Sequence, residues 1–209
     1  MTRPARVTLG VAVAVGLMFG PLDLAGQVNA PYPFANLFNS PAVWAAAAFV
    51  VGMWAKAPKV ALVSAVVMEV IAVEAYYAAD VVLRGADRSS LTSTTALAWL
   101  VLGVAAGVIF GTAGAHAQGG VRSVRIVARA LLPAVFVSEA VHEFLRHNAR
   151  RADQRADDLL AFGVLLGLVA AVALACMLVT ARRCDRGRIV GAVIVLSAIG
   201  TVGYAVVAG

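Results

Sequence analysis

The chain has 209 residues, of which 62% are hydrophobic and only 13% are charged. Soluble domains carry roughly 25% charged residues and about half apolar residues, so this composition excludes an ordinary soluble protein. The formal net charge of +6 does not indicate nucleic-acid binding, because the arginines lie in short segments between apolar runs, where positive charge orients membrane proteins.

Long apolar runs predict the fold. No Asp, Glu, Lys or Arg occurs in 7–22, 24–55, 89–121, 159–181 or 189–209. About 20 apolar residues in a helix cross a ~30 Å hydrocarbon core, and the runs do not alternate as barrel strands would. The sequence therefore predicts an all-α fold, a polytopic transmembrane helical bundle forming one domain over 1–209. We expect about seven spans, at 5–22, 41–56, 59–80, 94–116, 124–145, 158–180 and 188–207.

The first span follows the basic segment "MTRPAR" and has the shape of a signal peptide. No clear small-x-small cleavage site follows it, so we expect an uncleaved helix. The loops "AKAPK", "QGGVRSVR" and "ARRCDRGR" are basic like the N-terminus. The positive-inside tendency places them in the cytoplasm, which predicts a cytoplasmic N-terminus and a bacterial plasma-membrane location. "RHNARRADQRADD" resists this assignment, since it has four Arg yet falls outside.

The segment between the first two spans, "PLDLAGQVNAPYPFANLFNSP", is polar, contains Pro and has no basic residue. Irregular polar backbone near a membrane is tolerated where protein covers it or where it lines a cavity. We expect this segment to be an outer loop that gates a pocket, with four polar residues as the gate: Asp23, Asn29, Asn36 and Asn39.

The third and fifth spans carry ionisable residues. Such residues are costly inside a membrane and usually face a protein interior, a partner or a water-filled cavity. Glu74 and Glu139 lie at similar depths, and Tyr77 and His142 each follow one of them by three residues on the same helical face. These four groups predict a pocket in the outer half of the membrane that binds a solute or protons, with Glu69 nearer the centre as a further candidate. The alternative is that Glu139, Glu143 and Arg146 form a salt-bridged helix end.

A metal site is disfavoured. Glu139-x-x-His142 has the spacing found in di-iron helical bundles, but such sites need two of these motifs and two further Glu, and the chain has one. The metal question stays open, and we expect no cofactor. The tryptophans Trp44, Trp54 and Trp99 are predicted to anchor helix ends at the membrane interfaces.

Several segments together resemble an uncharacterised family of actinobacterial multi-pass membrane proteins, a domain of unknown function. They are "DLAGQ", "PFANLFNSPAVWAAAAFVVG", "VEAYY", "WLVLGVAAGVIFGTAG" and "VFVSEAVHE", within residues 10–145. The resemblance implies a small polytopic plasma-membrane protein and brings no catalytic residues with it.

Three functional hypotheses follow. The first is a non-enzymatic protein in the lipid bilayer that binds or transports a small solute, with proton coupling through the acidic residues. The second is a structural or regulatory subunit that pairs with a membrane protein partner or with further copies of itself. The third and least favoured is a membrane-embedded metal-dependent enzyme, so the question of enzymatic activity stays open.

Overall fold

The computed structural model describes residues 4–149 and 156–208, and within them it contains helices and no strand. Most of the chain lies in long helices joined by short loops. Their bounds are α1 Ala5–Asn29, α2 Phe34–Leu37, α3 Pro41–Ala55, α4 Pro58–Arg84, α5 Thr94–Ala106, α6 Thr112–His116, α7 Arg122–Ala149, α8 Ala156–Val179 and α9 Arg183–Ala208, with a 3₁₀ turn at Arg88–Thr92 and a π-helical turn at Gly107–Gly111. The predicted all-α fold is confirmed.

The helices cover the seven predicted spans but extend beyond several of them. α1 was predicted to end at residue 22 and instead continues through Pro21 to Asn29. A proline inside a membrane helix is tolerated when neighbouring helices support the backbone around it, and here α1 packs along α4. Asp23 therefore lies in a helix, and its placement in an irregular outer loop was wrong.

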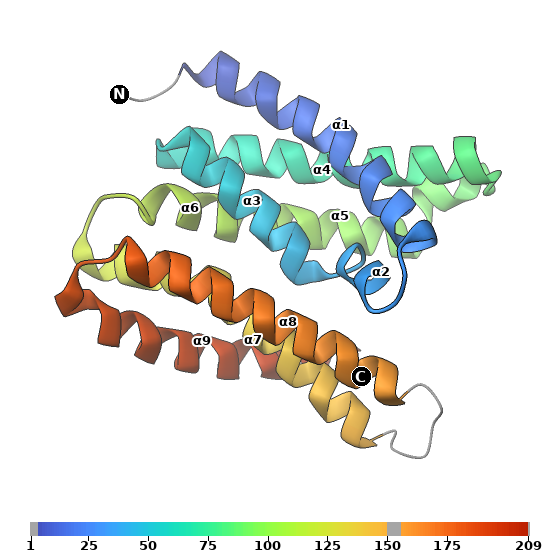
Figure 1. The fold of residues 1–209 in the computed structure, drawn as a ribbon. Helices are drawn as coiled ribbons and strands as arrows, with labels where there is room; N and C mark the ends of the chain where they lie inside the picture. The colour runs from blue at the N-terminus through green and yellow to red at the C-terminus, as the bar shows by residue number, and fades with distance from the viewer. Residues whose placement is uncertain (1–3, 150–155, 209) are drawn as a thin grey trace.

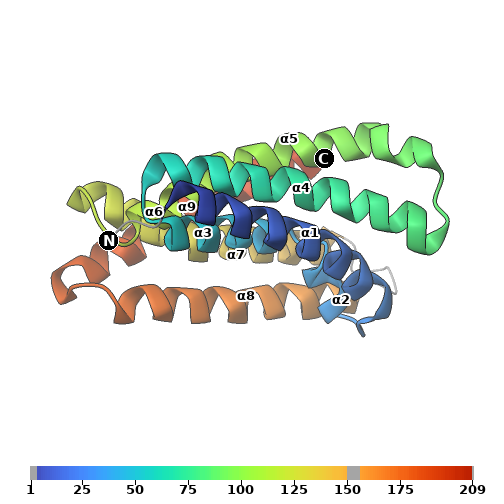
Figure 2. The same cartoon turned by 90° about the horizontal axis from the view of Figure 1, so that it is seen from above.

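Two groups of helices lie side by side (Figure 1). α1, α3, α4 and the α5–α6 helix form one group, whose buried side chains include Ala48 and Met68. α7, α8 and α9 form the other, and α8 lies to one side when the molecule is viewed from above (Figure 2). α3 packs against both α4 and α7, so it joins the groups, and Phe49 of α3 shares a core with Phe136 of α7 and Leu166 of α8.

Glycines bring two helices very close to the same level of α4, at residues two positions apart. A Cβ at Gly16 of α1 would lie 2.6 Å from the Met68 carbonyl oxygen, and one at Gly107 would lie 2.7 Å from the Val66 Cα. Small residues at such positions let helix backbones approach closely, which is the usual way in which membrane helices associate. The contacts fix α1 and the α5–α6 helix against α4.

Five helices are long and apolar enough to cross a membrane: α1, α4, the continuous α5–α6 helix, α8 and α9. Their length and composition indicate an integral membrane protein. α3 is apolar but has only 15 residues, about 22 Å of helix. α7 carries charged residues and is buried along one side by its neighbours. The full count of seven spans stays a prediction.

The helices alternate in direction, so the loops gather at two ends (Figure 1). The basic segments 4–6, 56–59, 117–122 and 180–183 lie at one end with the N-terminus. The segments 30–40 and 85–93 lie at the other end. This is the grouping that the charge pattern predicts, while the assignment of the basic end to the cytoplasm stays a prediction.

Candidate functional site: an aromatic and acidic cavity between α1, α3, α4 and α5

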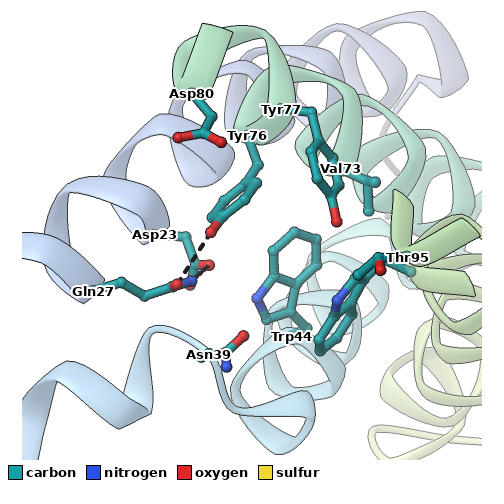
Figure 3. Close-up of a pocket in the computed structure, with 10 residues that line it drawn as sticks. Asp23, Gln27, Asn39, Trp44, Val73, Tyr76, Tyr77, Asp80 and Thr95 are labelled. Carbon is teal, nitrogen blue, oxygen red and sulfur yellow. Dashed lines mark hydrogen bonds between the residues drawn. The ribbon is translucent and has the colours of Figure 1, made fainter. Parts of the chain in front are cut away.

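A cavity of about 340 Å³ opens between α1, α3, α4 and α5 (Figure 3). It is lined by side chains from α1, α3, α4 and α5 and by Asn39, which precedes α3. The lining residues are Asp23, Gln27, Asn39, Trp44, Val73, Tyr76, Tyr77, Asp80, Thr95 and Trp99.

Asp23 is the buried acid of this cavity. Its side chain is only 3% exposed, and its Oδ2 accepts a hydrogen bond of 3.0 Å from the Gln27 amide one helical turn later. Its Oδ1 is buried and has no hydrogen-bond partner. Figure 3 shows the carboxylate pointing toward the space between Gln27, Tyr76 and Trp44. Because buried polar atoms are almost always satisfied, this oxygen is a candidate ligand-binding atom.

Gln27 is held in place by two further contacts. Its amide nitrogen donates to the Phe38 carbonyl at 3.0 Å, and its Oε1 accepts from the Tyr76 hydroxyl at 3.1 Å. These bonds connect α1 to the segment before α3 and to α4. They fix the position of Gln27 beside Asp23, and the Trp44 indole of α3 lies close to the same carboxylate.

Aromatic rings form much of the remaining wall. The rings of Trp44 and Trp99 lie 6.0 Å apart, centroid to centroid, with planes tilted by 35°. Tyr76 and Tyr77 make an edge-to-face pair with centroids 5.2 Å apart. Trp44 is only 7% exposed. Its predicted role as an interfacial anchor is therefore wrong, because the ring faces the cavity and packs edge-on against Phe19.

A second acid lies deeper, below the wall of the cavity. Glu69 is fully buried, one helical turn before Val73 of the lining, and neither of its carboxylate oxygens has a hydrogen-bond partner. It lies within electrostatic range of Asp23. A Cβ at Gly103 of α5 would lie 3.7 Å from the Glu69 Oε2, so this glycine leaves room for the carboxylate between α4 and α5.

The rim of the cavity carries a third acid, which is already paired. Asp80 forms an ion pair with Arg84 on the next turn of α4, with 3.1 Å between the Asp80 Oδ1 and the Arg84 Nη1. This leaves Asp23 as the lining carboxylate for which no ion pair is found among the described residues, because the ion pairs at Asp80, Glu143 and Asp185 involve other acids.

Glu139 lies elsewhere, beside a separate cavity of about 410 Å³ between α3, α5, α7, α8 and α9. Its Oε2 accepts hydrogen bonds from the Ser40 hydroxyl at 2.8 Å, the Ala42 backbone N–H at 3.0 Å and the Tyr204 hydroxyl at 3.2 Å. A carboxylate at a helix N-terminus satisfies free N–H groups and interacts favourably with the helix dipole. Glu139 therefore caps α3 from α7.

His142 and Glu143, which follow Glu139 on α7, also contact other side chains. The His142 ring stacks on Tyr204 with centroids 5.5 Å apart, and Arg146 donates to Glu143 at 2.9 Å. The predicted alternative of a salt-bridged end to this helix holds for Glu143 and Arg146, while Glu139 has different partners.

The structure does not bring together the pocket expected from Glu74, Tyr77, Glu139 and His142. Tyr77 lines the first cavity, Glu139 and His142 line the second, and Glu74 is exposed and lines neither. α3 packs against both α4 and α7, so the predicted pair of acids on α4 and α7 does not meet. Glu69 and Glu74 are five residues apart, about 140° around a helix, so only one of them can face inward.

The four predicted gate residues separate in the same way. Asp23 is buried in α1, whereas Asn29 is exposed at the end of α1 and donates to the Ala25 carbonyl. Asn36 lies in α2 and lines the second cavity, while Asn39 lines both cavities. Sequence reasoning did not identify Trp44, Trp99 and Tyr204 as site residues. The only available signal was their aromatic character, which fits membrane interfaces equally well.

The loop after α1 is tied to α8 by a tyrosine. The Tyr32 hydroxyl donates to the Asp158 carbonyl. Partial burial, together with the nearby carboxylates of Asp158 and Glu143, raises the pKa of Tyr32 to about 12. The phenol is therefore protonated and able to donate throughout the physiological pH range.

Within residues 4–149 and 156–208, no group of three or more His, Cys, Asp or Glu side chains lies close enough to hold a metal ion. The acids of the first cavity are accompanied by aromatic rings and amides, and those of the second cavity by aromatic rings and amides together with a histidine and an arginine.

The all-α bundle and its long apolar helices define the class: this is an integral membrane protein. The chain belongs to DUF6518, a family of unknown function whose model matches residues 1–209. The predicted resemblance to an uncharacterised family is thereby confirmed, and its actinobacterial origin stays a prediction. No curated protein and no solved structure matches the chain.

Proposed function

We propose that this protein binds a small solute in the cavity between α1, α3, α4 and α5 and carries it across the membrane. One observation carries the proposal: Asp23, which lines the cavity, has a buried carboxylate oxygen with no hydrogen-bond partner. A native protein rarely leaves such an atom unsatisfied unless a ligand, an ion or water completes it. Polar groups held inside a membrane protein usually mark substrate or ion pathways.

Proton coupling is supported by the second acid. Asp23 and Glu69 are both buried, lie within electrostatic range of each other and share no cationic partner among the described residues. Two buried carboxylates close together are costly to ionise unless a cation or a proton is taken up. Solute arrival at Asp23 would then change the proton occupancy of Glu69, which is the elementary step of a coupled carrier.

The surrounding helices supply a place for movement. The helix that carries Trp99 contains the π-helical turn Gly107–Gly111, and π-bulges are common sites of helix bending and of function. Bending there would move Thr95 and Trp99 relative to the fixed α1–α4 pair and would open or close the cavity.

The test uses the full chain in lipid nanodiscs and proteoliposomes. A panel of small solutes of different charge and polarity is screened for an increase in melting temperature, and each stabilising solute is then tested for uptake. We expect at least one solute to bind wild type and to lose binding in Asp23→Asn. Glu69→Gln is expected to keep binding and to lose the pH dependence of uptake.

Glu74→Gln is the matched control, because it removes a carboxylate from the same helix without touching the cavity. It should bind and transport like wild type. A panel in which no solute stabilises wild type more than Asp23→Asn would overturn the proposal.

The second candidate function is that of a subunit in a larger membrane complex, favoured by Glu74 itself. This residue is exposed about midway along α4, on a face that also exposes Val63. A carboxylate facing lipid at that depth is unfavourable, and a donor from a neighbouring helix would satisfy it. The mass of the complex extracted from native membranes should then fall in Glu74→Lys and not in Val63→Ala. An unchanged mass for both variants would remove this candidate.

A further inference from the structure

We propose that the solute taken by the cavity is a small organic cation, a quaternary or protonated ammonium compound. This rests on the proposed function and names the chemical class of its ligand. Charge, wall chemistry and size each support the assignment.

The charge of the lining selects against anions. The ten lining residues include two carboxylates and no Lys, Arg or His. Asp80 is paired with Arg84 at the rim, which leaves the inner carboxylate, Asp23, to be neutralised. An anion would meet this carboxylate without a compensating cation, whereas an ammonium group would satisfy its free Oδ1.

The wall chemistry selects an organic cation. Rings from three helices surround the space: Trp44 from α3, Tyr76 and Tyr77 from α4, and Trp99 from α5. The face of an aromatic ring attracts a cation, tryptophan most strongly, and aromatic cages are the common means of recognising quaternary ammonium groups. A weakly hydrated organic cation can give up its water to such rings.

A divalent metal ion fits this lining poorly. Calcium and magnesium take six or more oxygen ligands in close geometry. Here the Gln27 Oε1 already accepts from Tyr76, and one Asp23 oxygen already accepts from Gln27. The other oxygens of the lining belong to Asn39, Tyr77, Thr95 and Asp80, of which Asp80 is already paired with Arg84. Among the described residues no three His, Cys, Asp or Glu side chains lie close enough to hold a metal ion.

The size of the cavity limits the cation to a small one. At about 340 Å³ it lies near the lower end of the range for small-molecule sites, about 300–1,000 Å³. A head group with a short tail fits this volume. A compound with several rings would need the wall to move.

The experiment compares two probes of the same shape on the full chain in nanodiscs. Choline carries a quaternary nitrogen, and 3,3-dimethylbutan-1-ol has carbon in that place and is neutral. Affinity is measured by calorimetry and by quenching of tryptophan fluorescence, with tetramethylammonium, Mg²⁺ and a neutral sugar as further probes. We expect choline to bind on the order of tenfold more tightly than the neutral alcohol, or better.

Variants identify the groups responsible. Asp23→Asn should abolish the preference for choline over the alcohol, and Trp99→Leu should weaken choline binding more than alcohol binding. Trp99→Phe, which keeps an aromatic face, should restore part of the preference. Glu74→Gln should leave both affinities unchanged. The Trp99 series provides the test even where Asp23→Asn fails to insert.

The outcomes separate this inference from the function on which it rests. Equal binding of choline and its neutral isostere, or a preference for the sugar, overturns the organic cation while leaving a solute site. Tight Mg²⁺ binding that displaces choline overturns it in favour of a metal site. No binding by any probe or by any member of the wider solute panel overturns both proposals.

Discussion

The two helix groups each bury acidic residues, and the difference lies in how those acids are satisfied. In the α7–α9 group, one oxygen of Glu139 accepts three hydrogen bonds that join α7 to α3 and α9. In the α1–α6 group, Asp23 has one unsatisfied oxygen and Glu69 has two. A buried carboxylate that accepts several hydrogen bonds from other helices holds a structure together, whereas one with unsatisfied buried oxygens costs stability and is often kept for another role. The contrast indicates a structural role for Glu139 and supports the proposed functional role of the Asp23–Glu69 pair.

The largest effect is expected from Glu139→Ala. It removes the acceptor for Ser40, Ala42 and Tyr204 and leaves buried donors unpaired, which should destabilise the protein by roughly 2–4 kcal/mol. The measurement is the free energy of unfolding in detergent micelles. The folded fraction should still bind solute in the first cavity. An unchanged free energy of unfolding would contradict the structural role of Glu139 and remove the contrast between the two helix groups.

The next effect concerns the packing that shapes the cavity. Gly20→Ala places a Cβ against the Ala72 carbonyl oxygen of α4, and overpacking of this kind costs about 1–3 kcal/mol. Gly10→Ala is the matched control on the same helix, where a Cβ meets nothing within 4 Å, and its effect should be neutral or stabilising. Similar melting temperatures for the two variants would show that the close contact between α1 and α4 does not determine stability.

Asp23→Asn should have an effect of the opposite sign to Glu139→Ala. Replacing a buried, half-satisfied carboxylate by a neutral amide removes a desolvation cost, so stability should stay the same or rise by about 1 kcal/mol. Solute binding should be lost at the same time. If this variant is instead destabilised as strongly as Glu139→Ala, both acids are structural and the contrast between the two groups disappears.

The smallest effect is expected from Tyr32→Phe, which removes the hydrogen bond to the Asp158 carbonyl and should cost about 1 kcal/mol. The pKa of Tyr32 rises from 10.0 to about 12 on folding. Its contribution is therefore fully present below pH 10 and is lost as the pH rises from 10 toward 12. The stability difference between wild type and variant should be constant between pH 6 and 9. A difference that varies within that range would show that other groups control this contact.

The apolar runs of the sequence predicted the positions of the helices well, but not which helices pack against one another. All seven predicted spans coincide with helices, because long apolar runs leave the chain no other way to satisfy its backbone in lipid. The ends were less certain. α1 passes Pro21, and α9 begins at Arg183 rather than residue 188, where Asp185 pairs with Arg122 of α7 at 2.6 Å.

The site was predicted residue by residue but not as a set. Glu69, Tyr77 and Asp23 were singled out, and the structure brings Asp23 and Tyr77 to one cavity with Glu69 close below it. The equal membrane depth of Glu74 and Glu139 stays a prediction, whereas their predicted directions around the helix axes were wrong. Glu74 points out of the bundle and Glu139 points toward α3.

The sequence by itself determined that this protein is a helical bundle of the membrane, because hydrophobicity and length act locally along each helix. It also determined which end of the bundle collects the basic residues. Only the tertiary structure decided that Glu139 caps α3 while Asp23 and Glu69 remain without full partners. The reason is physical: satisfaction of a buried charge depends on which groups other helices bring within about 3 Å, and that depends on how the helices pack.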